Sequence, residues 1–105
     1  MFFSDYNSHL NSKLNPKLVW EYDLTNFDFQ NMRNVVVQRV IERGHFSDFY
    51  AMLNLYREDG VIQELKKVPY FNDMDMNFVS VVFNIPFQQL KSYQNKQLPN
   101  RHWNS

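Results

Sequence analysis

The chain has no cysteine and only two glycines among its 105 residues. Without cysteine it forms neither a disulfide nor a thiolate metal centre, a composition that fits a reducing compartment. The two glycines, Gly44 and Gly60, stand far apart, so no glycine-rich loop is available to cradle a phosphate. Disulfide scaffolds, zinc-thiolate domains and nucleotide-binding P-loops are therefore excluded.

Long apolar runs and an excess of one charge are also missing. No apolar stretch approaches the roughly 20 residues that a membrane-spanning helix needs, and the opening residues, MFFSDY, lack the basic and apolar regions of a signal peptide. Eleven basic and eleven acidic side chains balance to a formal net charge of zero, whereas DNA-binding domains usually carry a basic excess. We expect a soluble, cytoplasmic protein with no membrane segment.

What the chain does contain is enough apolar side chain for one packed domain. Hydrophobic residues make up 44% of the sequence and aromatic residues 17%, and a chain of this length has room for a single core. Polar stretches rich in Asn lie at both ends. We therefore predict a flexible N-terminal arm over residues 1–15, one helical domain over residues 16–93 and a frayed C-terminal tail over residues 94–105.

The strongest helical pattern runs over Phe29–Arg43. Its apolar residues recur at spacings of three and four, as they do on one face of a helix. Asp28 precedes the pattern as an N-cap, and Gly44 follows it where a left-handed residue commonly ends a helix. The β-branched run over residues 35–37 is an alternative start for a strand, but the helical period continues beyond it and favours the helix.

Three further helices are predicted over residues 48–56, 61–67 and 73–84, with N-caps at Ser47, at Asp59 and at Asn72 or Asp73. A turn over residues 57–60 separates the first two. Pro16 and Pro86 each open a shorter helical segment. Each helix has one apolar stripe, so the fold class that buries all of them is all-α: a compact, orthogonal or bundle-like array of four to six short helices.

The inward positions of these stripes form the predicted core. It consists of Val36, Val40, Phe49, Leu53, Leu65, Phe78 and Val82. On the last long helix, the stripe expected to face inward is Met74, Phe78, Val81, Val82 and Ile85.

No set of residues in the sequence matches a catalytic or metal-binding motif. The histidines are scattered, and a charged imidazole at His45 would favour the end of the preceding helix. Asp73 opens a run that resembles a calcium loop, but Phe78 and Asn84 stand where that loop needs Gly and Glu. The sequence has no motif for Ser–His–Asp, Cys–His or paired-carboxylate catalysis. We therefore expect no enzyme activity, no metal and no cofactor.

Four basic residues, Arg39, Arg43, Lys66 and Lys67, leave a DNA-binding alternative open. In addition, the two predicted helices joined by a Gly-containing turn over residues 47–68 have the outline of a helix-turn-helix. The second of these helices offers few Arg, Asn or Gln side chains that would reach base edges. We favour an ordinary solvated helix face over a nucleic-acid-binding patch.

Residues 20–93 contain short motifs in a fixed order. They are Trp20-Glu21-Tyr22-Asp23, then Arg39-Val40-Ile41-Glu42-Arg43-Gly44, then Tyr56, and finally an aromatic helix from Phe78 that runs into Asn84-Ile85-Pro86. In this order they resemble a family of small bacterial proteins of unknown function, although Glu21, Ile41 and Asn84 depart from its usual Asp, Leu and Gly. Members of that family are often encoded beside nucleotidyltransferase-like abortive-infection toxins, so the resemblance implies an antitoxin or another partner-binding role.

The sequence thus favours a non-enzymatic protein-interaction module with a protein partner, and a small DNA-binding regulator is the alternative. Self-association into a homo-oligomer stays open. The motif residues that serve either the fold or a partner contact are Trp20, Glu21, Asp23, Arg39, Arg43 and Gly44.

Two of these motif residues support a structural prediction. Trp20 is large and apolar, so it is expected to pack back onto the helix over residues 29–43 and to be mostly buried. Arg39 lies among apolar residues of that helix, where a covered guanidinium group needs a partner. Since a carboxylate can accept two parallel hydrogen bonds from it, we expect Arg39 to bond a carboxylate or backbone carbonyl within residues 21–28.

Overall fold

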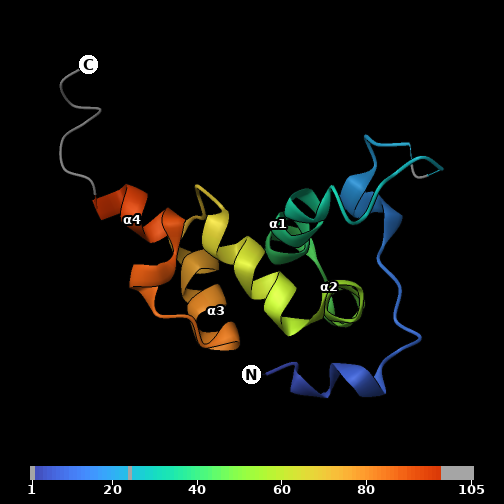
Figure 1. Cartoon of the computed structure of the whole chain (residues 1–105), viewed down its shortest axis with the longest axis horizontal. Helices are drawn as coiled ribbons and strands as arrows, with labels where there is room; N and C mark the ends of the chain where they lie inside the picture. The colour runs from blue at the N-terminus through green and yellow to red at the C-terminus, as the bar shows by residue number, and fades with distance from the viewer. Residues whose placement is uncertain (1, 24, 98–105) are drawn as a thin grey trace.

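The computed structural model describes residues 2–23 and 25–97, and within these ranges every regular element is a helix. The all-α prediction is therefore confirmed (Figure 1). In chain order the elements are the 3₁₀ turns η1 (Ser4–Ser8) and η2 (Pro16–Val19), the helices α1 (Arg33–Arg43), α2 (Phe46–Lys67) and α3 (Asp73–Phe83), the turn η3 (Phe87–Gln89) and the helix α4 (Lys91–Gln97). None of these described helices is long and apolar enough to cross a bilayer.

Helix α1 begins later than predicted but is a helix through its valine run. The Asp28 carboxylate accepts hydrogen bonds from the backbone N–H groups of Gln30 and Asn31, both at 3.1 Å, so it caps a separate turn that precedes the helix. The end at Gly44 has a different cause from the predicted one, because its backbone is extended (φ −76°, ψ 156°) and not left-handed. A Cβ atom at Gly44 would lie 2.7 Å from the carbonyl oxygen of Val40, so close approach of the backbone requires glycine there.

Helix α2 replaces the two predicted helices over residues 48–56 and 61–67. The predicted turn over residues 57–60 is reduced to one kinked residue, Arg57, with φ 64° and ψ 166°. The two halves of α2, on either side of Arg57, run in different directions (Figure 1). The N-cap is His45 rather than Ser47, because the Asp48 carboxylate accepts the backbone N–H of His45 at 2.9 Å. The predicted N-cap Asp59 lies inside the second half.

Helix α3 begins and ends close to its predicted limits. The side-chain oxygen of Asn72 accepts the backbone N–H of Asp75 at 2.8 Å and so caps the helix. Asn84 takes the left-handed conformation (φ 56°, ψ 47°) that ends it. Helix α4 continues to Gln97, past the predicted end of the domain at residue 93, and the rest of the predicted tail, residues 98–105, lies outside the described residues.

The core lies between α1, α2 and the inner face of α3. Five predicted core residues are buried: Val36, Val40, Phe49, Leu53 and Leu65. The prediction was wrong for α3, where Phe78 and Val82 are only half-buried while Met76, Val79 and Phe83 face inward. Because α3 is apolar around most of its circumference, hydrophobic periodicity alone did not identify its buried face.

The N-terminal segment differs from the expected loose arm, because residues 3–15 pack against α2. Phe3 is buried in the core and stacks on Phe49 with ring centroids 4.7 Å apart. The Asn54 side-chain amide donates hydrogen bonds to the carbonyl oxygens of Tyr6 and His9, both at 3.1 Å. This segment therefore contributes side chains and hydrogen bonds to the domain.

Candidate functional site

The motif residues Glu21 and Arg39 meet as predicted. The guanidinium group of Arg39 donates to the two carboxylate oxygens of Glu21 at 3.0 and 2.8 Å and to the carbonyl oxygen of Leu18 at 3.0 Å. The hydrogen bonds from Arg39 hold the pKa of Glu21 below its usual value. This pair fastens the turn η2 to the middle of α1, and the prediction of an Arg39–carboxylate bond is confirmed.

Trp20 does not pack back onto α1, and the prediction that it is buried was wrong. Its exposed fraction is 72%, whereas its neighbours Leu18 and Val19 are buried. Two adjacent residues of the short 3₁₀ turn η2 fill the space against α1, and the residue that follows them points outward. The motif therefore combines a structural ion pair with an exposed tryptophan.

The other motif residues have local roles. The Asp23 carboxylate accepts the backbone N–H of Thr25 at 3.0 Å and the side-chain amide of Asn26 at 3.2 Å, so it stabilises a turn. Arg43 is exposed at the end of α1, close enough to Glu21 to lower its pKa further. Gly44 permits the close backbone contact with Val40.

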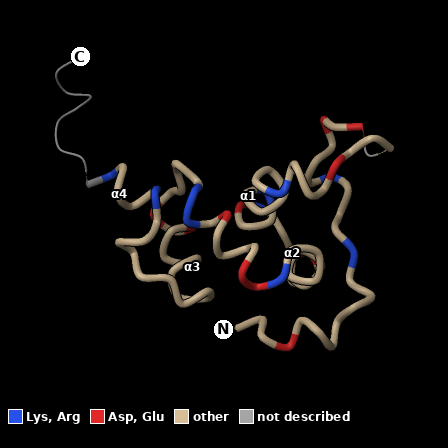
Figure 2. Tube along the Cα trace, viewed as in Figure 1, with Lys and Arg blue, Asp and Glu red and all other residues tan. Residues whose placement is uncertain are grey.

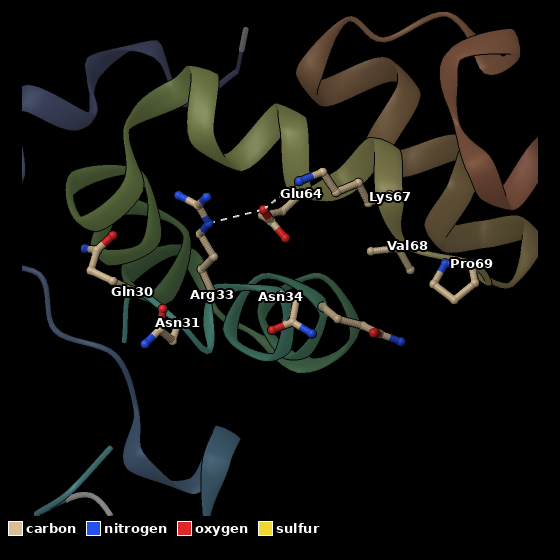
Figure 3. Close-up of a pocket in the computed structure, with 9 residues that line it drawn as sticks. Gln30, Asn31, Arg33, Asn34, Glu64, Lys67, Val68 and Pro69 are labelled. Atoms are coloured by element: carbon tan, nitrogen blue, oxygen red, sulfur yellow. Dashed lines mark ion pairs between the residues drawn. The ribbon is translucent and has the colours of Figure 1, made fainter. Parts of the chain in front are cut away.

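A polar pocket of about 500 Å³ lies between the turn before α1, the outer side of α1 and the end of α2 (Figure 3). At its centre is Glu64, whose side chain is only 8% exposed. The Nε atom of Arg33 lies 3.2 Å and the Nζ atom of Lys67 lies 3.6 Å from the same oxygen of Glu64. The amide side chains around it are Gln30, Asn31, Asn34 and Gln38.

The polar pocket is a neutralised junction between helices. Both cations converge on the one carboxylate (Figure 3), and burial of Glu64 without them would be costly. Sequence analysis missed Glu64, although its spacing from Val61 and Val68, both buried, places it on the inward stripe of α2. Among the described residues there is no group of three His, Cys, Asp or Glu side chains that would hold a metal ion.

A second, apolar groove of about 670 Å³ lies where the end of α1 and the start of α2 face α3. Its lining is Ile41, Gly44, His45, Phe46, Ser47, Phe49, Met74, Asp75 and Phe78. Ile41 and Phe49 belong to the core, but Phe46 is 65% and Met74 76% exposed. The groove therefore has a buried apolar floor and exposed apolar walls.

The apolar surface extends beyond the groove. Phe2 is exposed and its ring centroid lies 5.9 Å from that of Phe46. On α3, Met74, Phe78 and Val81 share one helical face because they are spaced four and three residues apart, and Val81 is 80% exposed. We call Phe2, Phe46, Met74, Phe78 and Val81 the groove face.

The groove also contains an acid in an unfavourable environment. Burial raises the pKa of Asp75, and the nearby carboxylate of Glu42 raises it further. By contrast, ion pairs join Glu21 to Arg39, Glu64 to Arg33 and Lys67, and Asp73 to Lys96. Lys and Arg residues are interspersed with Asp and Glu residues along the trace rather than gathered on one side (Figure 2).

Residues 14–65, just under half of the chain, match a family of unknown function, DUF6922. No curated protein and no solved structure matches the chain. The matched segment covers the Glu21–Arg39 pair, Trp20 and Phe46, while the α3 side of the groove face lies beyond it.

Proposed function

We propose that this chain, whose matching family has no assigned function, is a protein-interaction module without catalytic activity of its own. The observation that supports this is the groove face, on which Phe46, Met74 and Val81 are each more exposed than buried. Large apolar side chains that gather on one surface, rather than scatter singly, are typical of interaction sites. The groove between them offers a concave seat for side chains of a partner.

Several polar side chains that an active site could use are already engaged. Arg33 and Lys67 bind Glu64, and the Asp48 carboxylate accepts backbone N–H groups of His45 and Asn15 at 2.9 and 2.7 Å. Groups held in this way stabilise the fold and are not poised to transfer a proton or attack a substrate. These contacts favour a binding role over an enzymatic one.

We further propose that the partner is an enzyme encoded beside this chain, of the nucleotidyltransferase-like toxin class. This rests on the resemblance of the Trp20–Asp23 and Arg39–Gly44 motifs to the family described above. Exposed Trp20 adds a second aromatic anchor next to a rigid ion pair, since tryptophan is enriched among the residues that dominate binding energy. In this role the chain would act as an antitoxin that covers its partner.

The DNA-binding alternative receives less support. Binding to phosphates requires cations that are available to replace counterions. Arg39 is committed to Glu21 and Lys67 to Glu64, so two of the four basic residues that motivated this reading are already paired with carboxylates. The kinked α2 also places Glu64, and not a basic residue, on the inner side of its second half.

The test is co-expression of this chain, tagged at its C-terminus, with the proteins encoded beside it. We expect one of them to co-purify with the unaltered chain and to be lost with Met74→Asp combined with Val81→Asp. The matched control is Leu10→Asp, because Leu10 is 72% exposed and lines a different surface, away from the groove. A folded double variant that retains the partner as well as the control does would overturn the proposal.

A further inference from the structure

The groove is shaped for a segment of a partner that presents apolar side chains. Its floor consists of buried core residues, Ile41 and Phe49, and its walls are Phe46 and Met74. Met74 and Phe78 of α3 line one side of the groove, and Val81, one helical turn further on, continues their apolar stripe beyond it. An amphipathic helix that lays its apolar side chains into a hydrophobic groove is a common recognition mode for such a shape.

The charges at the groove specify which polar residues that segment should carry. Asp75 lines the groove and Glu42 is close enough to raise its pKa. Neither acid forms an ion pair with a Lys, Arg or His side chain within residues 2–23 and 25–97. Arg43, the cation nearest in sequence to Glu42, acts on Glu21, and Arg39, whose pKa Glu42 helps to raise, is itself paired with Glu21.

The Asp75 carboxylate is partly desolvated, and the charge of the exposed Glu42 carboxylate repels it. A cation bound beside Asp75 would interact favourably with both carboxylates. This attraction becomes stronger when the partner covers the groove and displaces water. An anion at the same position would be repelled, so Asp75 and Glu42 disfavour acidic partners and favour basic ones.

We infer that the groove binds an amphipathic helix of the partner whose apolar side chains fill the groove and whose Lys or Arg side chains face Asp75 and Glu42. This inference rests on the proposed function and specifies the partner's chemistry. The apolar contacts supply affinity, and the two carboxylates select for a basic helix. A second copy of this chain is the competing occupant, and the experiment below separates the two.

Two synthetic helical peptides serve as probes. Both carry the same leucine stripe, and the flanking positions are Lys in one and Glu in the other. Titration into the isotope-labelled full chain at low salt should shift the amide resonances of Phe46, Met74, Asp75 and Phe78. We expect the Lys peptide to bind at least about tenfold more tightly than the Glu peptide, a preference that shrinks as salt screens the charges.

The charge variants isolate the selective element. Asp75→Asn combined with Glu42→Gln should make the two peptides bind within about twofold of each other, because the apolar groove is unchanged. The control is Asp59→Asn combined with Glu58→Gln, which removes two acids from the second half of α2 and should leave the preference intact. Equal binding of both peptides by the unaltered chain, or shifts confined to another surface, would overturn the inference.

Two outcomes distinguish this inference from the proposed function. If Met74→Asp with Val81→Asp loses the natural partner while Asp75→Asn with Glu42→Gln keeps it, the interaction module stands and the basic-helix inference fails. If the chain dimerises with increasing concentration, and Met74→Asp abolishes the dimer, the groove takes a second copy and both the partner helix and its charge are rejected.

Discussion

Helices α1 and α3 have the same length, 11 residues, but use their apolar side chains differently. In α1 the buried residues Val36, Val37, Val40 and Ile41 form one inward side, and the outer side is polar and joined by ion pairs to other parts of the chain. In α3, Met76, Val79 and Phe83 face inward while Met74 and Val81 are exposed on another side. The apolar residues of α1 pack in the core, whereas those of α3 are divided between the core and the groove face.

The difference separates stability from binding. An apolar side chain contributes to folding in proportion to the area it removes from water, so Met74 and Val81 contribute little to the stability of the isolated chain. Their contribution comes when another surface covers them. Substitutions in the core should therefore lower stability most, whereas substitutions of Met74 and Val81 should mainly weaken partner binding.

The largest effect is expected in the core between α1 and α2. Leu53 and Leu65 are both fully buried, so Leu53→Ala or Leu65→Ala should each lower the free energy of unfolding by about 2–5 kcal/mol, because each leaves a partial cavity. Chemical denaturation measures this, with Leu55→Ala, at a 39% exposed position, as the mild control. Losses below about 0.5 kcal/mol at both buried sites would show that the core is placed incorrectly.

Tyr56 offers a prediction with a pH dependence. Its hydroxyl donates a hydrogen bond to the carbonyl oxygen of Phe29 at 2.7 Å, and burial raises its pKa to about 12. The folded-state pKa of Tyr56 lies above the unfolded value of about 10. The protonated Tyr56 hydroxyl therefore contributes to stability fully below pH 10, and this contribution is lost as the pH rises toward 12. Tyr56→Phe should cost about 1–2 kcal/mol at neutral pH.

The same variant should also flatten the alkaline loss of stability. Thermal denaturation at a series of pH values between neutrality and 12 measures both effects. If the unaltered chain and Tyr56→Phe lose stability in parallel over that window, the Tyr56 hydroxyl does not have the raised pKa that its burial produces.

A smaller effect is expected on the polar side of α1. Arg39→Lys keeps the charge but cannot donate two parallel hydrogen bonds to Glu21, so unfolding should become easier by about 1 kcal/mol. Because the pKa of Glu21 is lowered in the folded chain, its ionised carboxylate stabilises the fold at neutral pH, and this stabilisation is lost as the pH falls. The stability of Arg39→Lys should therefore decrease less in acid than that of the unaltered chain. Arg43→Lys is the control. Partner loss with unchanged stability would make Arg39 a contact residue instead.

The smallest effect on stability is expected on the groove face. Met74→Asp or Val81→Asp should change the free energy of unfolding by no more than about 0.5 kcal/mol, the usual range for surface substitutions. The same variants should weaken partner binding most. Differential scanning calorimetry is the measurement, and a loss comparable to that of Leu53→Ala would mean that this face is packed within the chain.

Local rules in the sequence predicted some helix starts and the buried faces of α1 and α2, but not every helix end. Asn72 caps α3 with its own side chain and Pro16 occupies the first position of η2, so both starts were predictable from local sequence. The Glu21–Arg39 pair was predictable because a guanidinium group and a carboxylate fit each other in a fixed geometry. The buried face of α3 was not predictable, since α3 is apolar around most of its circumference and fits the core in more than one rotation.

Three other features depended on tertiary packing. Nothing local marks Arg57 as the residue that takes a positive φ, while Gly60, the expected turn residue, is helical. Glu64 is buried because Arg33 of another helix reaches it. Trp20 is exposed because Leu18 and Val19 already occupy the space against α1.

The kink at Arg57 has a consequence for how the chain opens. Helix propagation is cooperative only along an unbroken backbone, and the conformation of Arg57, which favours glycine, interrupts α2 between residues 56 and 58. The first half is held by the N-terminal segment and the second by Arg33. Amide hydrogens of the two halves should therefore exchange with solvent in separate events. A partner bound at Phe46 would slow exchange in residues 46–56 and leave residues 58–67 unchanged.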